Sequence, residues 1–191
     1  MSQSDSMVLF RALPIELSLS PDEKRVLRSY ARTLGTHVAN RRLFTCVIAD
    51  DHELRRLNKV FLGHDYATDV LSFPSAAHPG ELGELIISTE RAESQASEFG
   101  HSRVDEIRIL MLHGVLHLCG MDHDQDRDND RDNDRDNDHD NDHDKDRGEM
   151  ARAEQKWREE LGLPATLIAR TLGARDESRT SSATTRAGRA R

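Results

Sequence analysis

Three histidines in the second half of the chain have the residue type and the spacing of a metal site. His113 and His117 are four residues apart, and His123 follows six residues later. Apolar residues around the first two recur at helical spacing and predict a helix with one buried stripe: Val104, Ile107, Leu110, Met111, Val115 and Leu118. Two histidines four residues apart project from the same face of such a helix, close enough to share one ion.

The third histidine reaches the same ion if the helix ends between it and the other two. Gly120 is suited to a left-handed helix stop, after which the chain can fold back and deliver His123. Three neutral imidazoles with an open fourth position are the ligand set of a catalytic zinc, which lowers the pKa of its bound water to about 7. The sequence therefore predicts one Zn²⁺ per chain, held by His113, His117 and His123. A purely structural zinc usually has four protein ligands, often including cysteine, so a catalytic site is favoured.

Gly114 separates this motif from the best-known zinc proteases. In an H-E-x-x-H metallopeptidase the residue after the first histidine is the glutamate that acts as general base. Glycine at that position can neither accept nor donate a proton. The histidine and glycine offsets resemble the longer metzincin pattern, but the missing base disfavours a metallopeptidase.

Residues 113–123 resemble the H-G-x-L/V-H-L-x-G-x-D-H motif of the YbeY family, the bacterial rRNA maturation endoribonucleases. Two further blocks occur upstream in the family's order: Leu57-Asn58, Phe61, Gly63, Asp65 and Thr68 to Pro74, then Leu82 to Ser88. The similarity covers about residues 40–123 and continues more weakly to about 163. It implies a zinc-dependent, single-strand-specific endoribonuclease that acts in 16S rRNA 3′-end maturation and ribosome quality control. It also implies small-subunit ribosomal RNA precursor as substrate and the ribosome or its proteins as partners, with no DNA and no membrane.

One position departs from the family. Many members carry an arginine, thought to contact the RNA phosphate, three residues before the aspartate that matches Asp65, where this chain has Leu62. His64 and Lys59 are candidates to supply that charge, and the alternative is that Leu62 packs under the loop while His64 is solvated. Asp122 is a third candidate, either orienting a ligand histidine or serving as a solvated turn residue. The general base stays open between zinc hydroxide and the RNA 2′-hydroxyl. A non-catalytic, zinc-containing ribosome-assembly factor is the alternative to an enzyme.

The net charge of −8 belongs to one segment. Residues 122–147 hold 13 aspartates against five Lys or Arg, mostly in tandem tetrapeptides of the type Arg-Asp-Asn-Asp. A tract without apolar residues cannot offset its ordering entropy and is expected to be disordered. The alternating aspartates also resemble a calcium loop, but glycine and glutamate are missing from the required places. His139 and His143 begin tetrapeptides as His123 does, yet a ligand from a disordered loop costs more ordering entropy, which favours His123.

The remaining pattern predicts an α+β fold, a small mixed sheet packed by helices, in a single domain with the metal-ligand helix central. Strands are expected over residues 7–17, 43–49, 70–73 and 84–88, and helices over residues 21–35, 52–61, 89–99 and 149–161, with Ser102 and Asp105 opening the ligand helix. The predicted organisation is a disordered N-terminus (1–6), an enzyme domain (7–172) with the acidic insert at 124–147, and a disordered basic tail (173–191).

Composition favours a cytoplasmic enzyme. The N-terminal residues lack the apolar segment of a secretory signal, and no apolar run approaches the roughly 20 residues of a membrane span. Cys46 and Cys119 lie in apolar contexts and are expected to be buried, reduced thiols rather than a disulfide or metal ligands.

Overall fold

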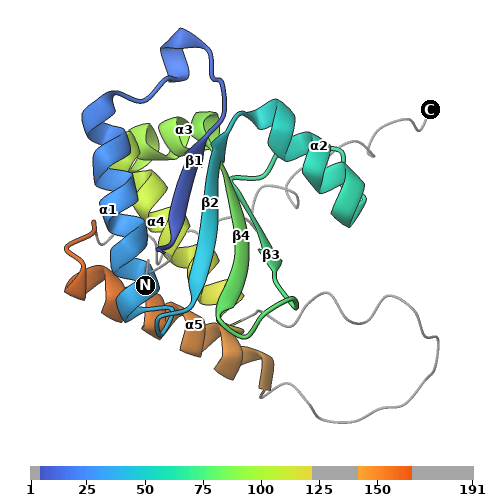
Figure 1. The fold of residues 1–191 in the computed structure, drawn as a ribbon, viewed down its shortest axis with the longest axis vertical. Coiled ribbons are helices and arrows are strands. Elements are labelled where there is room, and N and C mark those ends of the chain that lie inside the picture. The colour runs from blue at the N-terminus through green and yellow to red at the C-terminus, as the bar shows by residue number, and fades with distance from the viewer. Residues whose placement is uncertain (1–4, 122–141, 165–191) are drawn as a thin grey trace, which may run out of the picture.

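The computed structural model describes residues 5–121 and 142–164, with side chains in the second range described from Gly148 onward (Figure 1). In these ranges the elements follow one another as β1 (Met7–Phe10), a 3₁₀ turn (Ile15–Leu17), α1 (Pro21–His37), β2 (Leu43–Ala49), α2 (Asp51–Leu62), β3 (Val70–Pro74), β4 (Glu81–Ser88), α3 (Thr89–Phe99), α4 (Arg103–Leu118) and α5 (Asp142–Glu160). No helix in the described residues is long and apolar enough to cross a membrane.

The four strands form one mixed sheet in the order β1-β2-β4-β3. β1, β2 and β4 run parallel, and β3 pairs antiparallel with β4. The two parallel pairs are joined by long connections that contain helices, whereas β3 and β4 form a short hairpin-like pair. The predicted α+β class, with a small mixed sheet packed by helices, is confirmed.

Alternation along the strands divides the apolar residues between two faces. On β2 and β4, Cys46 and Leu85 belong to the main core with α1 and α4, whereas Ala49 and Ile86 belong to a smaller cluster with Leu54 of α2. Figure 1 shows α4 behind the sheet and α1 beside β1, with α2 projecting on the other side near β3. The ligand helix therefore packs directly on the sheet.

α4 is more deeply buried than the sequence pattern predicted. Instead of one apolar stripe, ten of its sixteen residues are buried, including Glu106 and Gly114. α4 contacts the sheet, α1, α3 and α5, so it is the central helix of the fold. His113 and His117 are two of its few residues that remain partly exposed.

The expected helix starts are confirmed by capping hydrogen bonds. The Ser20 hydroxyl accepts from the Glu23 amide while the Glu23 carboxylate accepts from the Ser20 amide, a complete capping box. Ser102 Oγ accepts from the Asp105 amide at 3.1 Å and opens α4. α2 begins after Asp50, whose side chain accepts from the Glu53 amide.

Several boundaries differ from expectation. The strand expected over residues 7–17 ends at Phe10, and a 3₁₀ turn follows Pro14, a residue that cannot donate to a sheet. Ser6, expected to lie in a disordered terminus, is buried, and its hydroxyl accepts from the Phe44 amide. α5 begins at Asp142 rather than at residue 149, so the last part of the acidic repeat has helical backbone.

Candidate metal centre

The C-terminal part of α4 brings two of the predicted metal ligands together. His113 and His117 face each other with their Nε2 atoms 3.0 Å apart and their ring centres 4.6 Å apart. Past Cys119 the helix ends at Gly120, which adopts the left-handed conformation (φ 89°) and donates its amide to the His117 carbonyl. The shared face of the two histidines and the helix stop are confirmed.

This pair fits a zinc ion. Two nitrogen ligands about 2.0–2.1 Å from one tetrahedral zinc lie about 3.3 Å apart, close to the separation of the two Nε2 atoms. Neutral imidazole is also a preferred zinc donor. His123 and Asp122 lie outside the described residues, as does His139, and so does the side chain of His143. Among the residues that the structure does describe, no group of three or more possible ligands is found.

Glu154 of α5 is a site residue that the sequence analysis missed. Its Oε2 lies 3.2 Å from His113 Nδ1, on the side of the ring opposite the Nε2 that faces His117. Its other oxygen lies 3.2 Å from Arg158 Nε, one helical turn later. Glu154 and Arg158 are at helical spacing, but no local pattern indicates that they meet a histidine 41 residues earlier. Only the packing of α5 on α4 reveals this contact.

Gly114 is packed in a way that excludes a side chain. A Cβ built at this position would lie 2.7 Å from Leu85 Cδ2 and 3.3 Å from Ser72 Oγ, both on the sheet. Leu85 is fully buried and cannot withdraw into solvent. The position that holds the general base in H-E-x-x-H peptidases is therefore closed by the core of this fold.

Residues 59–69, the end of α2 and the segment that leads to β3, carry the other candidates and are termed the α2–β3 loop. Leu62, at the end of α2, is 54% exposed, so the alternative in which it packs under the loop is wrong. His64 is exposed, and its ring stacks on Tyr66 with centres 5.5 Å apart. Neither side chain is held by the core.

Lys59 shares the carboxylate of Asp65 with a second cation. Lys59 Nζ lies 3.1 Å and Arg55 Nε 2.7 Å from the two oxygens of Asp65. The hydrogen bond from Arg55, followed by that from Lys59, lowers the pKa of Asp65 to about 2. Arg55 was not a sequence candidate, although it lies one turn before Lys59 on the same face of α2.

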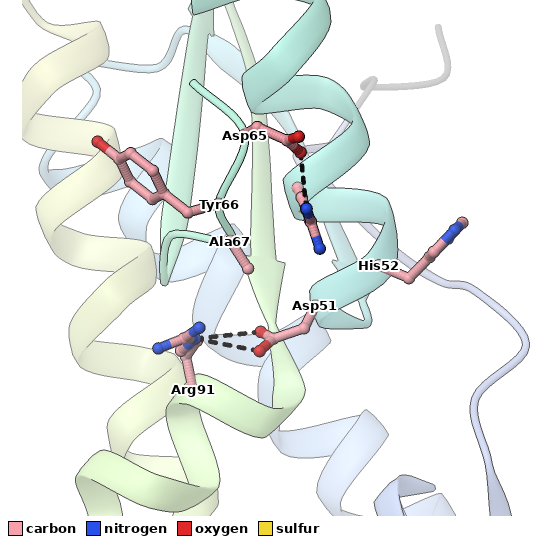
Figure 2. A pocket seen from close by; sticks show the side chains of 7 residues that line it. Asp51, His52, Asp65, Tyr66, Ala67 and Arg91 are labelled. Atoms are coloured by element: carbon pink, nitrogen blue, oxygen red, sulfur yellow. Dashed lines mark hydrogen bonds and ion pairs between the residues drawn. The ribbon is translucent and has the colours of Figure 1, made fainter. Parts of the chain in front are cut away.

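An open hollow of about 450 Å³ lies beside this segment, lined by Asp51, His52, Arg55, Asp65, Tyr66, Ala67 and Arg91. Figure 2 shows the ion pair between Asp51 and Arg91, whose Oδ2 and Nε atoms are 3.1 Å apart. A second ion pair joins Asp65 to Arg55. The Ser88 hydroxyl also donates to Asp51 at 2.6 Å. Neither α4 histidine lines this hollow, so it is distinct from the metal centre.

The two cysteines are free. Cys46 is fully buried in β2, as expected, whereas Cys119 at the end of α4 is only half-buried, because the helix ends there at the edge of the core. Burial raises the pKa of the Cys119 thiol. Its sulfur lies 4.0 Å from the Val38 carbonyl, a contact with the residue after α1.

Comparison with known proteins places these features in one family. The family described as Endoribonuclease YbeY matches residues 18–141, about two thirds of the chain. The chain belongs to this family. Among relatives named Endoribonuclease YbeY, the protein of Solibacter usitatus is 46% identical over 169 residues, which is 88% of this chain and 97% of the relative. That of Nautilia profundicola is 43% identical over 125 residues, 65% of this chain and 76% of the relative. The solution structure of a Thermotoga maritima protein is 21% identical, covers 82% of this chain and 93% of its own, and has a TM-score of 0.44.

The match to the family model includes the α4 histidines and the α2–β3 loop but not α5. The matched residues include His113, His117 and His123, and they also include Leu62. They end one residue before α5, the helix that carries Glu154. The similarity to the Solibacter usitatus relative extends past residue 141, but none of the motif blocks described above includes Glu154, so its contact with His113 is an observation of this structure.

Proposed function

We propose that this YbeY-family protein is a zinc-dependent endoribonuclease that hydrolyses phosphodiesters of single-stranded RNA. Its proposed role is 16S rRNA 3′-end maturation and ribosome quality control in the cytoplasm, with ribosomal RNA precursor as substrate and the ribosome as partner. The observation that carries this proposal is the pair of imidazole nitrogens 3.0 Å apart on α4, in a family whose members are named endoribonucleases.

The chain would hold the metal through His113, His117 and His123. Bound zinc would supply Lewis acidity, which activates water for attack at phosphorus and offsets charge on a phosphoryl oxygen. Glu154 Oε2 lies 3.2 Å from His113 Nδ1, on the side of the ring away from the Nε2 that would face the ion. Arg55 and Lys59 lie on an exposed surface where they would attract an RNA backbone, although Asp65 shares their charge.

The packing of Gly114 argues against the metallopeptidase alternative. A base at that position would have to occupy space filled by Leu85, so proton transfer would need another group. Three histidine ligands with an open fourth position favour an enzyme over a non-catalytic assembly factor. That distinction requires activity measurements on one preparation.

The test combines elemental analysis with nuclease and casein assays on wild type, His117→Ala and a matched His37→Ala control. His37 is an exposed histidine at the end of α1, so its removal should change neither zinc nor activity. We expect about one zinc per chain in wild type and in His37→Ala, little in His117→Ala, and cleavage of single-stranded RNA only where zinc is retained. Equal zinc in wild type and His117→Ala would refute the ligand assignment. Casein cleavage without RNA cleavage would support a peptidase, and zinc binding without either activity would support an assembly factor.

A further inference from the structure

Glu154 joins the candidate metal centre to the last helix of the described chain. Its two oxygens are divided between partners on different helices, with Oε2 at 3.2 Å from His113 Nδ1 and Oε1 at 3.2 Å from Arg158 Nε. The side chains of Glu154 and Arg158 are only 12% and 5% exposed. A carboxylate so deeply buried is costly unless it is paired, so its position against an imidazole calls for a specific role.

The contact selects one tautomer of His113. A neutral imidazole carries its proton on one nitrogen only, and a carboxylate oxygen can accept but not donate. Glu154 therefore favours the proton on Nδ1, which leaves a lone pair on Nε2. This Nε2 is the atom that lies 3.0 Å from His117 Nε2.

Arg158 fixes the carboxylate that makes this selection. Its Nη1 also donates to the Pro164 carbonyl at 3.2 Å, just beyond the end of α5, so the guanidinium is held from two directions. α5 is further anchored by the buried side chain of Met150 and by Arg108 of α4, which donates to the Leu161 carbonyl. The carboxylate is thus presented to His113 by a helix whose own position is fixed.

We propose that Glu154 is a positioning residue of the metal centre, which with Arg158 holds His113 in the Nδ1-protonated tautomer and aims its Nε2 at the ion. The effect on zinc affinity rests on the zinc site of the proposed function, whereas the tautomer of His113 is a property of the metal-free protein. α5 is then part of the site and not only a cover for the core. Interactions of this kind typically change metal affinity by about 10- to 100-fold when they are removed.

The experiment has two readouts. The first is the ¹⁵N chemical shifts of His113 in metal-free protein at pH 8, which report the tautomer. The second is the zinc dissociation constant from competition with a chelator at the same pH. Wild type should show protonated Nδ1, and Glu154→Ala should shift His113 toward protonated Nε2 and weaken zinc binding about 10- to 100-fold. Glu154→Gln keeps an acceptor oxygen but loses the charge, so it should be intermediate in both.

Met150→Ala separates positioning from simple docking of α5. Met150 is a buried apolar residue of the same helix, so this variant loosens α5 without removing the carboxylate. Metal-free melting temperatures of the variants would show how far each one destabilises the protein. A wild-type tautomer and wild-type affinity in Glu154→Ala would overturn the proposal. So would a loss of zinc affinity in Met150→Ala as large as that in Glu154→Ala at equal destabilisation. If wild type binds no zinc, the proposed function fails, and the tautomer measurement still decides whether Glu154 orients His113.

Discussion

The end of α4 and the α2–β3 loop differ in how their candidate residues are held. His113 and His117 stand on a helix that is buried on most sides, and His113 is contacted by a buried carboxylate from α5. Leu62 and His64 are exposed, and Asp65 is held by ion pairs at the surface. Surface ion pairs contribute about 0–1 kcal/mol each, whereas changes in a packed core cost several times more. The candidate metal centre is therefore fixed by packing, whereas the part proposed to face RNA is held more weakly.

Gly114→Ala should have the largest effect on stability, because it tests the packed part directly. The added methyl group would meet Leu85, and such overpacking costs about 1–3 kcal/mol of unfolding free energy. Gly148→Ala in α5 is the matched control, since its methyl group would meet only the flexible end of Arg152. Alanine is favoured over glycine in a helix by about 1 kcal/mol, so the control should be neutral or stabilising. Urea unfolding of both variants measures the difference, and equal effects would show that α4 tolerates movement away from the sheet.

Leu62→Arg tests the exposed part. Because Leu62 is more than half exposed, arginine there should leave the melting temperature nearly unchanged. If this position faces substrate phosphate, cleavage of single-stranded RNA should rise about two- to five-fold at low salt, as expected from about 0.5–1 kcal/mol for one exposed charge contact. The gain should shrink as salt is added.

Val60→Arg is the matched control, because Val60 is a similarly exposed neighbour on α2. An equal gain in both variants would indicate general attraction of RNA rather than a phosphate contact at position 62. His64→Ala belongs to the same series and should lower activity only if His64 supplies the missing charge. Unchanged activity in all three would mean that the α2–β3 loop does not contact the scissile phosphate.

The ion pairs of Asp65 should have a smaller effect, on the stability of the folded protein, and only over a defined pH range. Its pKa is lowered from 3.8 to about 2, chiefly by Arg55, so the pairing favours the folded protein above pH 3.8 and this contribution is lost as the pH falls toward about 2. In a carboxyl NMR titration, Arg55→Gln should raise the pKa of Asp65 more than Lys59→Gln does. The opposite order would show that Lys59 is the main partner in solution and that the loop differs from the structure described.

Removal of whole tetrapeptides from the acidic repeat should have the smallest effect on stability and on zinc content. Deletion of residues 127–138 takes away three Arg-Asp-Asn-Asp units and no apolar side chain. Shortening this connection to roughly half its length should change the unfolding free energy by at most about 0.6 kcal/mol, through loop-closure entropy alone. Zinc content should stay at the wild-type level. A marked fall in zinc content would show that the repeat contributes to the metal centre.

The sequence predicted those parts of the fold that are determined by residues close to one another in the chain. Serine caps and the spacing of apolar residues predicted α1 and the start of α4 because both act within a few residues. The shared face of His113 and His117 was predictable for the same reason. The contact of Glu154 with His113 spans 41 residues and depends on how α5 docks, which no local pattern encodes. The burial of ten of the sixteen residues of α4 was likewise missed, because it comes from contacts with the sheet and three helices rather than from its own periodicity.

The closed space at Gly114 also bears on how this site can evolve. By sequence alone, Gly114→Glu would complete an H-E-x-x-H motif, which places the chain one substitution from a peptidase signature. In the folded protein that substitution would drive a carboxylate toward the buried side chain of Leu85, and an unpaired buried charge is strongly disfavoured. A single substitution would therefore complete the peptidase motif in sequence but would be strongly destabilising in the folded protein. The packing of β4 against α4 would have to change first.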